Sequence, residues 1–473
     1  MKRFVFFFAF LNSCLIVCSQ ADPAVVCQYG FTFEISMQKN WGYSQPVVLT
    51  VTTNSQADAA GLCVNDIIEK INDKPTAGEN VETITSWLQN SSDQIQLTIS
   101  NLKEKHRDRT LTKICRMNNS LSEKDLVGIY TFYSLEDAQT RAFACPFKTT
   151  FHPESDLIHY ATFGFAEPDP NDRDVRKSMD DAIRKGLEEK GLKFTEKNPD
   201  LIVQTHCSLV ANPNFLNSPN ADKFPVVCRY NVQTKSMEKL PIYYNSLLQA
   251  NQAKFFLKLN IRLIDNKENK NSVVWECEAN ELLQSNYSLV DYAEFHIPLM
   301  FMQYPYSKSM EAPEYQYARF KYNYTGIHYN IDNLKEVTEV DPSSPAEKAG
   351  IQAGDVIEKI NGIKFINTPK LADNNYRQFI FKTSFLRDPA TQFTNAEGFT
   401  RCMYWDATKY AQIRVEFKKP EYSTVFSYLF YFEPYINASP DYNIVSFNIL
   451  RGKEKKAIDI KPVVVSEERL ECR

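Results

Sequence analysis

The chain has 473 residues and a formal net charge of −4, with 54 lysines and arginines against 58 aspartates and glutamates. This near balance gives no basic footprint of the kind that binds nucleic acid, so a nucleic-acid partner is not expected. The length allows about three domains.

The first 21 residues have the pattern of a secretory signal peptide. A basic start precedes an apolar run from Phe4 to Val17, and small residues end the segment at Ala21. Because no later segment has the roughly 20 uninterrupted apolar residues of a membrane span, we expect export without a retained helix. Lipid attachment at Cys18 is the alternative, although Val17 stands where a small residue is usual.

Nine cysteines remain after cleavage at Ala21, and the formal charge becomes −6 because two basic residues are lost. Their scattered positions and the lack of CxxC spacing argue against a zinc or redox site. We therefore expect no metal, no cofactor, and mostly buried thiols with one or two disulfides. The cysteines lie at positions 27, 63, 115, 145, 207, 228, 277, 402 and 472.

One segment occurs twice in the chain. Residues 59–72 read AAGLCVNDIIEKIN, and residues 348–361 read KAGIQAGDVIEKIN. A repeat near both ends of a chain indicates one module used twice.

The first copy contains the signals of a short helix followed by a turn. Ser55 is the expected N-cap, Gly61 ends the helix, and Asn65 takes a turn position with positive φ. Upstream, Gly30 leads into a strand with apolar residues at alternate positions. Further elements are predicted as a strand over 47–53, a helix over 81–88 and a strand over 95–99.

Residues 146–310 are predicted to form a separate α+β unit. A helix over 174–190 ends at Gly191, and Pro298 makes a single straight helix over 292–302 doubtful. Strands are predicted over 158–165, 200–206, 255–263 and 273–279, the last two as an antiparallel hairpin.

The second copy repeats the helix and turn signals more strongly. Ser344 to Glu347 has the pattern of a capping box with proline at the first helical position, and Gly350 is the expected end of the helix. Gly354-Asp355 turns into a strand over 356–360, which Asn361-Gly362 ends. Other strands are expected after Gly326, over 336–340 and over 444–453.

An aromatic-rich insertion of about 65 residues, 376–440, interrupts this second copy. Within it, residues 422–432 alternate well enough for a strand. We expect the insertion to pack against the central unit, because an exposed run this apolar would aggregate. A lid or a partner surface is the alternative.

The order of elements in both copies resembles the PDZ domain, whose AGL..GD.I..ING core both nearly spell out. The central order, with its NPDLIV and VVWECEA strands, is similar to a domain of unknown function common in bacterial envelope lipoproteins. The resemblance implies an α+β, multidomain fold. Two PDZ-like, partly open β-barrels with two helices each would flank a central α+β domain with an antiparallel sheet.

The expected boundaries follow from these elements. They are a signal peptide at 1–21, a first PDZ-like domain at 22–116, a linker at 117–145, the central domain at 146–310, a linker at 311–323, a second PDZ-like domain at 324–463, and a tail at 464–473.

The PDZ resemblance implies that an extended peptide adds as a strand beside the glycine-led strand of each copy. It also implies that backbone N–H groups at the glycine loop hold a free C-terminal carboxylate. Apolar side chains on the strand would form the pocket for an apolar terminal residue, whereas His328 is interpreted as a strand residue and not a switch. The residues so assigned to peptide binding are Gly30, Phe31, Thr32, Phe33, Gly326, Ile327, His328 and Tyr329.

Catalytic motifs are missing from the sequence. It contains no HExxH, no Gly-x-Ser-x-Gly, no Asp-Thr-Gly and no phosphate-cradling glycine-rich loop. The six histidines, at 106, 152, 159, 206, 296 and 328, have no metal-ligand spacing. A serine-lysine dyad stays open because its partners would lie far apart in sequence. No catalytic residue is assigned, and we expect a non-enzymatic protein.

The expected function is therefore that of an exported envelope protein, an adaptor or scaffold that binds peptides or protein C-termini. The expected location is the periplasm or the outer membrane of a Gram-negative bacterium. Two alternatives remain open. One is a structural envelope protein whose grooves are filled by its own segments, and the other is a PDZ-associated peptidase with a cryptic site.

Overall fold

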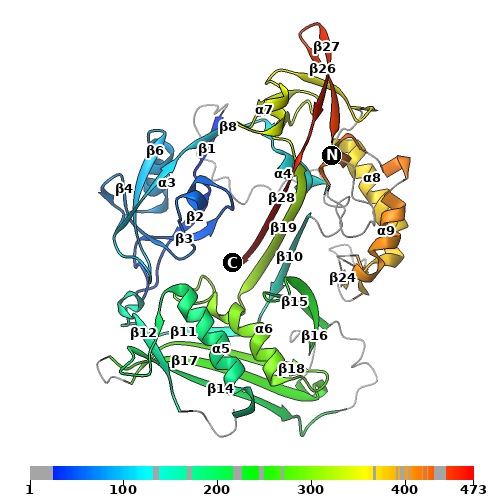
Figure 1. Cartoon of the computed structure of the whole chain (residues 1–473). Coiled ribbons are helices and arrows are strands. Elements are labelled where there is room, and N and C mark those ends of the chain that lie inside the picture. The colour runs from blue at the N-terminus through cyan, green and yellow to red at the C-terminus, as the bar shows by residue number, and fades with distance from the viewer. Residues whose placement is uncertain are drawn as a thin grey trace.

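The computed structural model describes residues 25–130, 138–167, 173–216, 226–243, 250–267, 271–365, 369–389, 392–394, 400–402, 405–417, 419–422, 424–430 and 444–472. The predicted signal peptide, with Cys18, lies outside these residues. The described elements form a mixed α+β structure with a first unit (residues 25–117), a central unit (145–308) and a second unit (119–130 and 325–460) (Figure 1). Among these residues, no helix is long and apolar enough to cross a membrane.

The first unit is built on a 6-stranded sheet in the order β2-β3-β4-β6-β7, with β5 paired to β4. The predicted cap and turn residues are confirmed: the Ser55 side chain accepts from the Asp58 N–H, and Gly61 and Asn65 have φ of 75° and 73°. The elements are β1 (Val25–Gln28), β2 (Phe31–Ile35), β3 (Pro46–Val51), α2 (Gln56–Ala59), β4 (Ile67–Ile71), β5 (Lys74–Pro75), α3 (Val81–Gln89), β6 (Gln94–Ser100), β7 (Arg107–Thr112) and β8 (Ile114–Met117).

The central unit has an 8-stranded sheet in the order β13-β12-β14-β17-β18-β16-β15, with β11 also paired to β18. The predicted hairpin is confirmed as β17 and β18, but the sheet is mixed, because β12 runs parallel to β13 and β14. Its strands are β11 (Phe147–Phe151), β12 (Thr162–Phe165), β13 (Lys193–Phe194), β14 (Leu201–Ala211), β15 (Val226–Asn231), β16 (Ser236–Tyr243), β17 (Phe255–Asp265) and β18 (Val273–Leu283).

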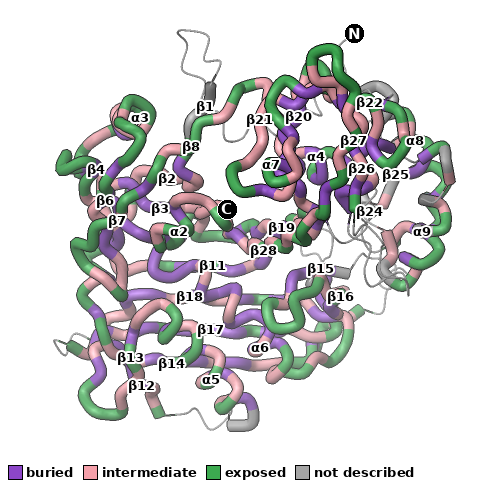
Figure 2. Tube along the Cα trace, turned by 45° about the horizontal axis from the view of Figure 1, so that its top comes forward, coloured by how far each residue is buried: buried purple, intermediate pink, exposed green. Residues whose placement is uncertain are grey.

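Two helices, α5 (Arg173–Lys190) and α6 (Leu289–Phe301), lie side by side over one face of this sheet (Figure 1). Figure 2 shows buried stretches along β11, β17 and β18 in the layer beneath them. One face of α5, formed by Val175, Met179, Ile183 and Leu187, is buried, and the predicted end of the helix at Gly191 is confirmed by a φ of 108°.

The doubt about a continuous helix at Pro298 is wrong, since α6 runs through it. Proline has no N–H to donate to the carbonyl of Glu294, four residues earlier. The side-chain amide of Gln233 donates to that carbonyl at 3.2 Å. A neighbouring loop thus satisfies the acceptor that proline leaves unpaired.

The second unit has two sheets, in the orders β21-β20-β9 and β23-β22-β26-β27. The Ser344 side chain accepts from the Glu347 N–H, and Gly350 has φ of 92°. The capping box is only half formed, because the Glu347 carboxylate accepts from Ser343 N and not from Ser344 N. The elements are β9 (Ser120–Leu121), α4 (Glu123–Ile129), β20 (Ile327–Asn330), β21 (Val337–Val340), α7 (Pro345–Ala349), β22 (Val356–Ile360), β23 (Ile363–Lys364), β26 (Val445–Arg451) and β27 (Glu454–Ile460).

The described residues of the insertion are folded, and the strand expected over 422–432 is wrong in its described part. A 3-10 helix, η11 (Val425–Leu429), forms there because its aromatic residues turn into the core of the second unit. The Phe426 ring lies 5.1 Å from that of Tyr329 and 5.4 Å from that of Phe365. The aromatic residues therefore pack in the second unit. Among the described residues, the insertion also contacts the central unit, as expected, through the ion pair of Asp388 with Lys239 of β16 at 2.8 Å. The other elements are α8 (Pro369–Lys382), η7 (Ser384–Leu386), β24 (Gln392–Thr394), β25 (Thr400–Cys402), η9 (Ala407–Lys409), α9 (Tyr410–Phe417) and η10 (Pro420–Tyr422).

The described residues of the segments expected as linkers and tail are also structured. β10 (Ala138–Ala144), β19 (Glu314–Tyr324) and β28 (Val463–Cys472) form an antiparallel 3-stranded sheet, here called the spine sheet. It runs between the central unit and the second unit (Figure 1). Linker sequences at 117–145 and 311–323 and the tail at 464–473 thus supply the connection between units.

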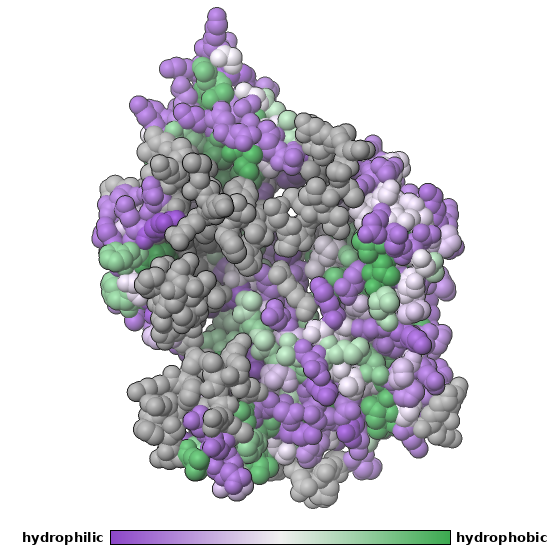
Figure 3. Space-filling view, turned by 180° about the vertical axis from the view of Figure 1, so that it is seen from behind, coloured by the Kyte–Doolittle hydropathy of each residue, from purple (hydrophilic) through white to green (hydrophobic). Residues whose placement is uncertain are grey.

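Seen from behind, the described residues show apolar side chains in small separate clusters among hydrophilic ones (Figure 3).

Candidate functional site

The two glycine loops predicted to bind peptides are built alike. Gly30 and Gly326 have φ of 90° and 93°, a region that favours glycine. A Cβ on Gly30 would lie 2.1 Å from Ser55 Cβ, and a Cβ on Gly326 would lie 2.3 Å from Ser344 Cβ. Each loop therefore packs directly against the serine that caps the following helix, and only glycine fits there.

The loop carbonyls have matching partners in the two units. Ala57 N donates to Tyr29 O at 3.0 Å, and Ala346 N donates to Thr325 O at 2.9 Å. The carbonyl groups of Tyr29 and Thr325 are thus paired with the following helix. The N–H groups of the two loops are separate donors that can bind other acceptors. We call β2 with Tyr29 and Gly30 the first edge, and β20 with Thr325 and Gly326 the second edge.

The first edge is unpaired on its outer side within the described part of the chain. There β2 pairs only with β3, and all of its residues, including Phe31, Thr32 and Phe33, are half-buried. No acceptor among the described residues meets Tyr29 N or Gly30 N. Helix α3 packs into the same apolar cluster through Trp87 and Leu88.

The second edge is occupied by the chain itself. Strand β9 pairs antiparallel with β20, with Leu121 opposite Tyr329 and Ser120 opposite Asn330. Ile331 N donates to Asn119 O at 2.8 Å. The strand that an external peptide would form is therefore already present.

Glu123 fills the loop of the second edge. Its carboxylate accepts from Thr325 N at 2.6 Å, Gly326 N at 3.0 Å, Thr325 Oγ1 at 2.5 Å and Tyr428 Oη at 2.7 Å. The Glu123 side chain is buried, and this burial raises its pKa, while the four hydrogen bonds act in the opposite direction.

The expectation that Gly326, Ile327, His328 and Tyr329 present an unoccupied edge is therefore wrong in this structure. Ile327 and Tyr329 are core residues with no exposed surface, and Tyr329 Oη lies 2.7 Å from Tyr428 Oη. The signal that could have revealed the occupant is Ser122-x-x-Asp125, which forms the capping box of α4.

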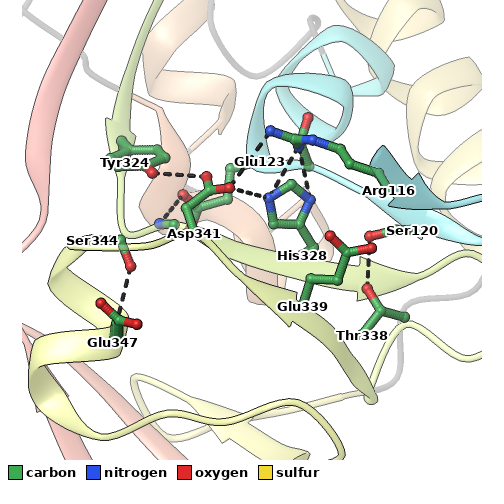
Figure 4. Close-up of polar contacts among 12 residues, drawn as sticks. Arg116, Ser120, Glu123, Tyr324, His328, Thr338, Glu339, Asp341, Ser344 and Glu347 are labelled. Atoms are coloured by element: carbon green, nitrogen blue, oxygen red, sulfur yellow. Dashed lines mark hydrogen bonds and ion pairs between the residues drawn. The ribbon is translucent and has the colours of Figure 1, made fainter. Parts of the chain in front are cut away.

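His328 lies where the first and second units meet. Its Nε2 is 2.9 Å from Asp341 Oδ1, and the Arg116 guanidinium of β8 lies 3.1 Å from the ring nitrogens (Figure 4). Burial acts to raise the pKa of Asp341, but His328, Tyr324 and Arg116 outweigh it, so this pKa lies below its usual value. His328 thus belongs to a charged junction that sequence reasoning missed.

The repeated aspartates have different partners in the two copies. Asp66 accepts from Cys63 N at 2.8 Å and Asn101 Nδ2 at 2.7 Å, and burial raises the pKa of Asp66 to about 6. Asp355 accepts from Arg451 through both Nε and Nη2 at 2.7 Å. The side chain that pairs with the repeated aspartate is thus a neutral amide in the first copy and a cation in the second.

A buried charge cluster lies in the central unit. Arg229 donates to both Glu281 carboxylate oxygens at 2.5 and 3.3 Å, and Tyr292 Oη donates to Glu281 Oε1 at 3.1 Å. Burial lowers the pKa of His296, whose Nε2 lies 2.9 Å from Arg229 Nη1. The cluster is enclosed, so it serves the interior of the fold. Among the described residues, no group of three or more acidic, histidine or cysteine side chains is placed to hold a metal.

Comparison with known proteins identifies the units. The PDZ domain family model matches residues 47–100 and 336–373, and the model of a domain of unknown function (DUF4136) matches residues 147–306. A solved PDZ domain protein from Parabacteroides distasonis is 39% identical, with a TM-score of 0.81, over 95% of this chain and 100% of that chain. The chain belongs to the family of PDZ domain proteins.

The predicted arrangement is thereby confirmed, with two PDZ domains flanking a DUF4136 domain. The first and second units are from here on the first and second PDZ domains. The search of curated proteins finds no match.

Two distant solved structures carry no argument about this chain. The PelC dodecamer from Paraburkholderia phytofirmans is 10% identical over 34% of this chain and 94% of that chain, with a TM-score of 0.17. The photosystem II D1 C-terminal processing protease is 13% identical over 39% of this chain and 47% of that chain, with a TM-score of 0.16.

Proposed function

We propose that the protein binds an extended peptide or a protein C-terminus by strand addition at the first edge. The observation that carries this proposal is the outer side of β2, which has no partner among the described residues. PDZ domains bind peptides and proteins, and an unpaired strand edge supplies the main-chain hydrogen bonds for it. The proposal takes each PDZ domain as a partly open β-barrel with two helices.

A terminal carboxylate would lie at the N–H groups of Tyr29 and Gly30. The second edge supports this assignment, because there the corresponding N–H groups of Thr325 and Gly326 hold the Glu123 carboxylate. Phe31 and Phe33, with ring centroids 6.5 Å apart, would contact an apolar terminal residue.

We further propose that the protein is an exported, non-catalytic adaptor of the bacterial envelope. The leader at residues 1–21 supports export, with lipid attachment at Cys18 as one form of anchoring. Cys115 is disulfide-bonded, which fits an oxidising compartment such as the periplasm.

Calorimetry with the full chain tests the binding site. The probes are hexapeptides that differ in their terminal residue, each made with a free and an amidated C-terminus. We expect apolar termini with a free carboxylate to bind at least about tenfold more tightly than their amides, because charge-assisted hydrogen bonds are lost on amidation. Equal affinities would reject the carboxylate assignment.

A matched pair of variants locates the peptide. Phe33→Ser at the first edge is expected to weaken binding, whereas Phe381→Ser, at a side chain that is 81% exposed on α8, is not. An equal effect of both substitutions would remove the first edge as the site.

A structural role is the second candidate, and it applies to the second PDZ domain. Its edge is filled by β9 and Glu123, so this domain is not offered as a recruitment site.

A further inference from the structure

We propose that residues 119–123 are the built-in ligand of the second PDZ domain, with the Glu123 side chain in the place of a peptide's terminal carboxylate. The inference rests on the proposed function, which assigns the glycine loop as a carboxylate site. It goes further by naming the ligand of the second site and its source, a segment of the same chain.

The main chain of this segment is held as an added strand. β9 is antiparallel to β20 and lies on the side of β20 opposite β21. The contact continues at one end through Asn119 O with Ile331 N, and at the side through Ser120 Oγ with Thr338 Oγ1 at 2.7 Å. The segment therefore runs toward the glycine loop as it approaches Glu123.

The carboxylate is bound by a dedicated set of donors. Two backbone N–H groups and the hydroxyls of Thr325 and Tyr428 all donate to Glu123. Removing a carboxylate from water is costly unless hydrogen bonds replace the water, and here four of them do. A loop that holds a buried carboxylate in this way functions as a carboxylate receptor.

The two PDZ domains share this loop but differ in its occupant. The glycine, the capping serine and the carbonyl bonds correspond in both. Only the second loop has a carboxylate from the described chain. The inference assigns external ligands to the first edge and the internal ligand to the second.

The ligand is anchored on both sides. After it, α4 places Leu126 and Val127 in the core of the second PDZ domain, and Lys124 pairs with Glu467 of β28. Before it, Met117 N donates to Glu339 Oε1 at 2.6 Å. Because β8 of the first PDZ domain leads directly into the segment, occupation of the second site also fixes the first domain to the second.

Hydrogen exchange on the full chain tests the assignment. In Glu123→Ala, the amides of Thr325 and Gly326 are expected to exchange on the order of 10-fold faster or more, since they lose a charged acceptor. The matched control is Asp125→Asn, which weakens the capping box of α4 through Ser122 without touching the loop. It should speed exchange in α4 and leave Thr325 and Gly326 unchanged.

Chemical rescue distinguishes carboxylate binding from general destabilisation. Sodium acetate, compared with sodium chloride at equal ionic strength, should restore slow exchange at Thr325 and Gly326 in Glu123→Ala, and have no effect on the wild-type chain. Should Glu123→Ala fail to fold, Glu123→Gln keeps the side-chain volume and should still speed exchange at both amides.

Three results would each overturn the proposal: unchanged loop exchange in the folded Glu123 variant, the same exchange pattern in the Glu123 and Asp125 variants, or no protection by acetate in folded Glu123→Ala. Peptide binding at the first edge is measured separately, and exchange over residues 29–35 should not change in these variants. A failure of the first edge to bind peptides would leave these exchange results intact, so the two failures can be told apart.

Discussion

Asp66 and Asp355 occupy the same position of the repeated segment, yet each has a different physical setting. Asp66 is buried with an amide partner, Asn101, whereas Asp355 is buried with the cation Arg451. The same residue type in the two copies therefore has a neutral partner in one and a charged partner in the other.

Asp66 should make the first PDZ domain less stable as the pH rises. Its pKa is about 6 in the folded chain against an ordinary 3.8, so the folded state favours the protonated acid. Its contribution is fully present below the ordinary pKa and is lost as the pH passes about 6, by about 3 kcal/mol. Urea unfolding of wild type and Asp66→Asn between about pH 4 and pH 7.5 checks this. As the pH rises, the free energy of unfolding of the variant should increase relative to that of the wild type. A difference in unfolding free energy that stays constant with pH would contradict the assignment.

Arg451→Met should destabilise the second PDZ domain by about 3 kcal/mol, because it leaves Asp355 buried without its cation. Asn101→Ala in the first copy removes the neutral donor to Asp66 and the Oδ1 acceptor of Lys103 N and Glu104 N, but no charge. It should have a smaller effect, about 1 to 2 kcal/mol. Denaturant unfolding of both variants measures the contrast. Equal losses would mean that the ion pair has no special role.

At the scale of elements, helix α4 lies outside both PDZ matches and still belongs to the second PDZ core. Leu126→Ala should cost about 3 kcal/mol, the usual range for a buried leucine. Ile129→Ala on the same helix, where the side chain is 37% exposed, is the control and should cost much less. Thermal unfolding, followed by hydrogen exchange of the amides in β20 and β26, measures the loss of stability. Similar losses at the two positions would show that the burial of Leu126 has no special role.

Elements set by local signals were predictable from the sequence, and elements set by a distant partner were not. The caps at Ser55 and Ser344 and the turns at Gly61, Asn65 and Gly350 depend on a few neighbouring residues, and all form as predicted. β9 has only two residues and exists because β20 offers it an edge. The alternation over 422–430 predicts a strand in isolation, but the aromatic core of the second PDZ domain selects 3-10 helices.

In the candidate site too, the locally determined loops were predictable and the contact with a distant residue was not. Gly30 and Gly326 could be placed in their loops because their conformation excludes other residues. The occupation of one loop could not be predicted, since Glu123 and Gly326 lie 203 positions apart and no periodic pattern connects them.

At the scale of the whole molecule, the spine sheet joins the DUF4136 domain to the second PDZ domain. Its strands come from segments whose sequences look like linkers. β28 contributes the last strand, Gln303 Nε2 lies 2.7 Å from Cys472 Sγ, and Glu467 pairs with Lys124. The C-terminal ten residues therefore hold together parts far apart in the sequence.

Truncation after Lys461 should uncouple the domains, because it exposes the long edge of β19 and removes the Lys124 pair. We expect one thermal transition for the full chain and two for the variant, with association of the variant in size-exclusion chromatography. Val463→Ser with Val464→Ser is the control, since both side chains are about half exposed. A truncated chain that stays monomeric with one transition would contradict the role given to β28.

The 203-residue separation between Glu123 and Gly326 also bears on assembly. A chain made from its N-terminus contains Glu123 long before it contains Gly326, because the DUF4136 domain lies between them. The sheet that pairs β9 with β20 can be completed only after synthesis has passed the whole DUF4136 domain. Closure of this sheet is thus a late event in the production of the chain.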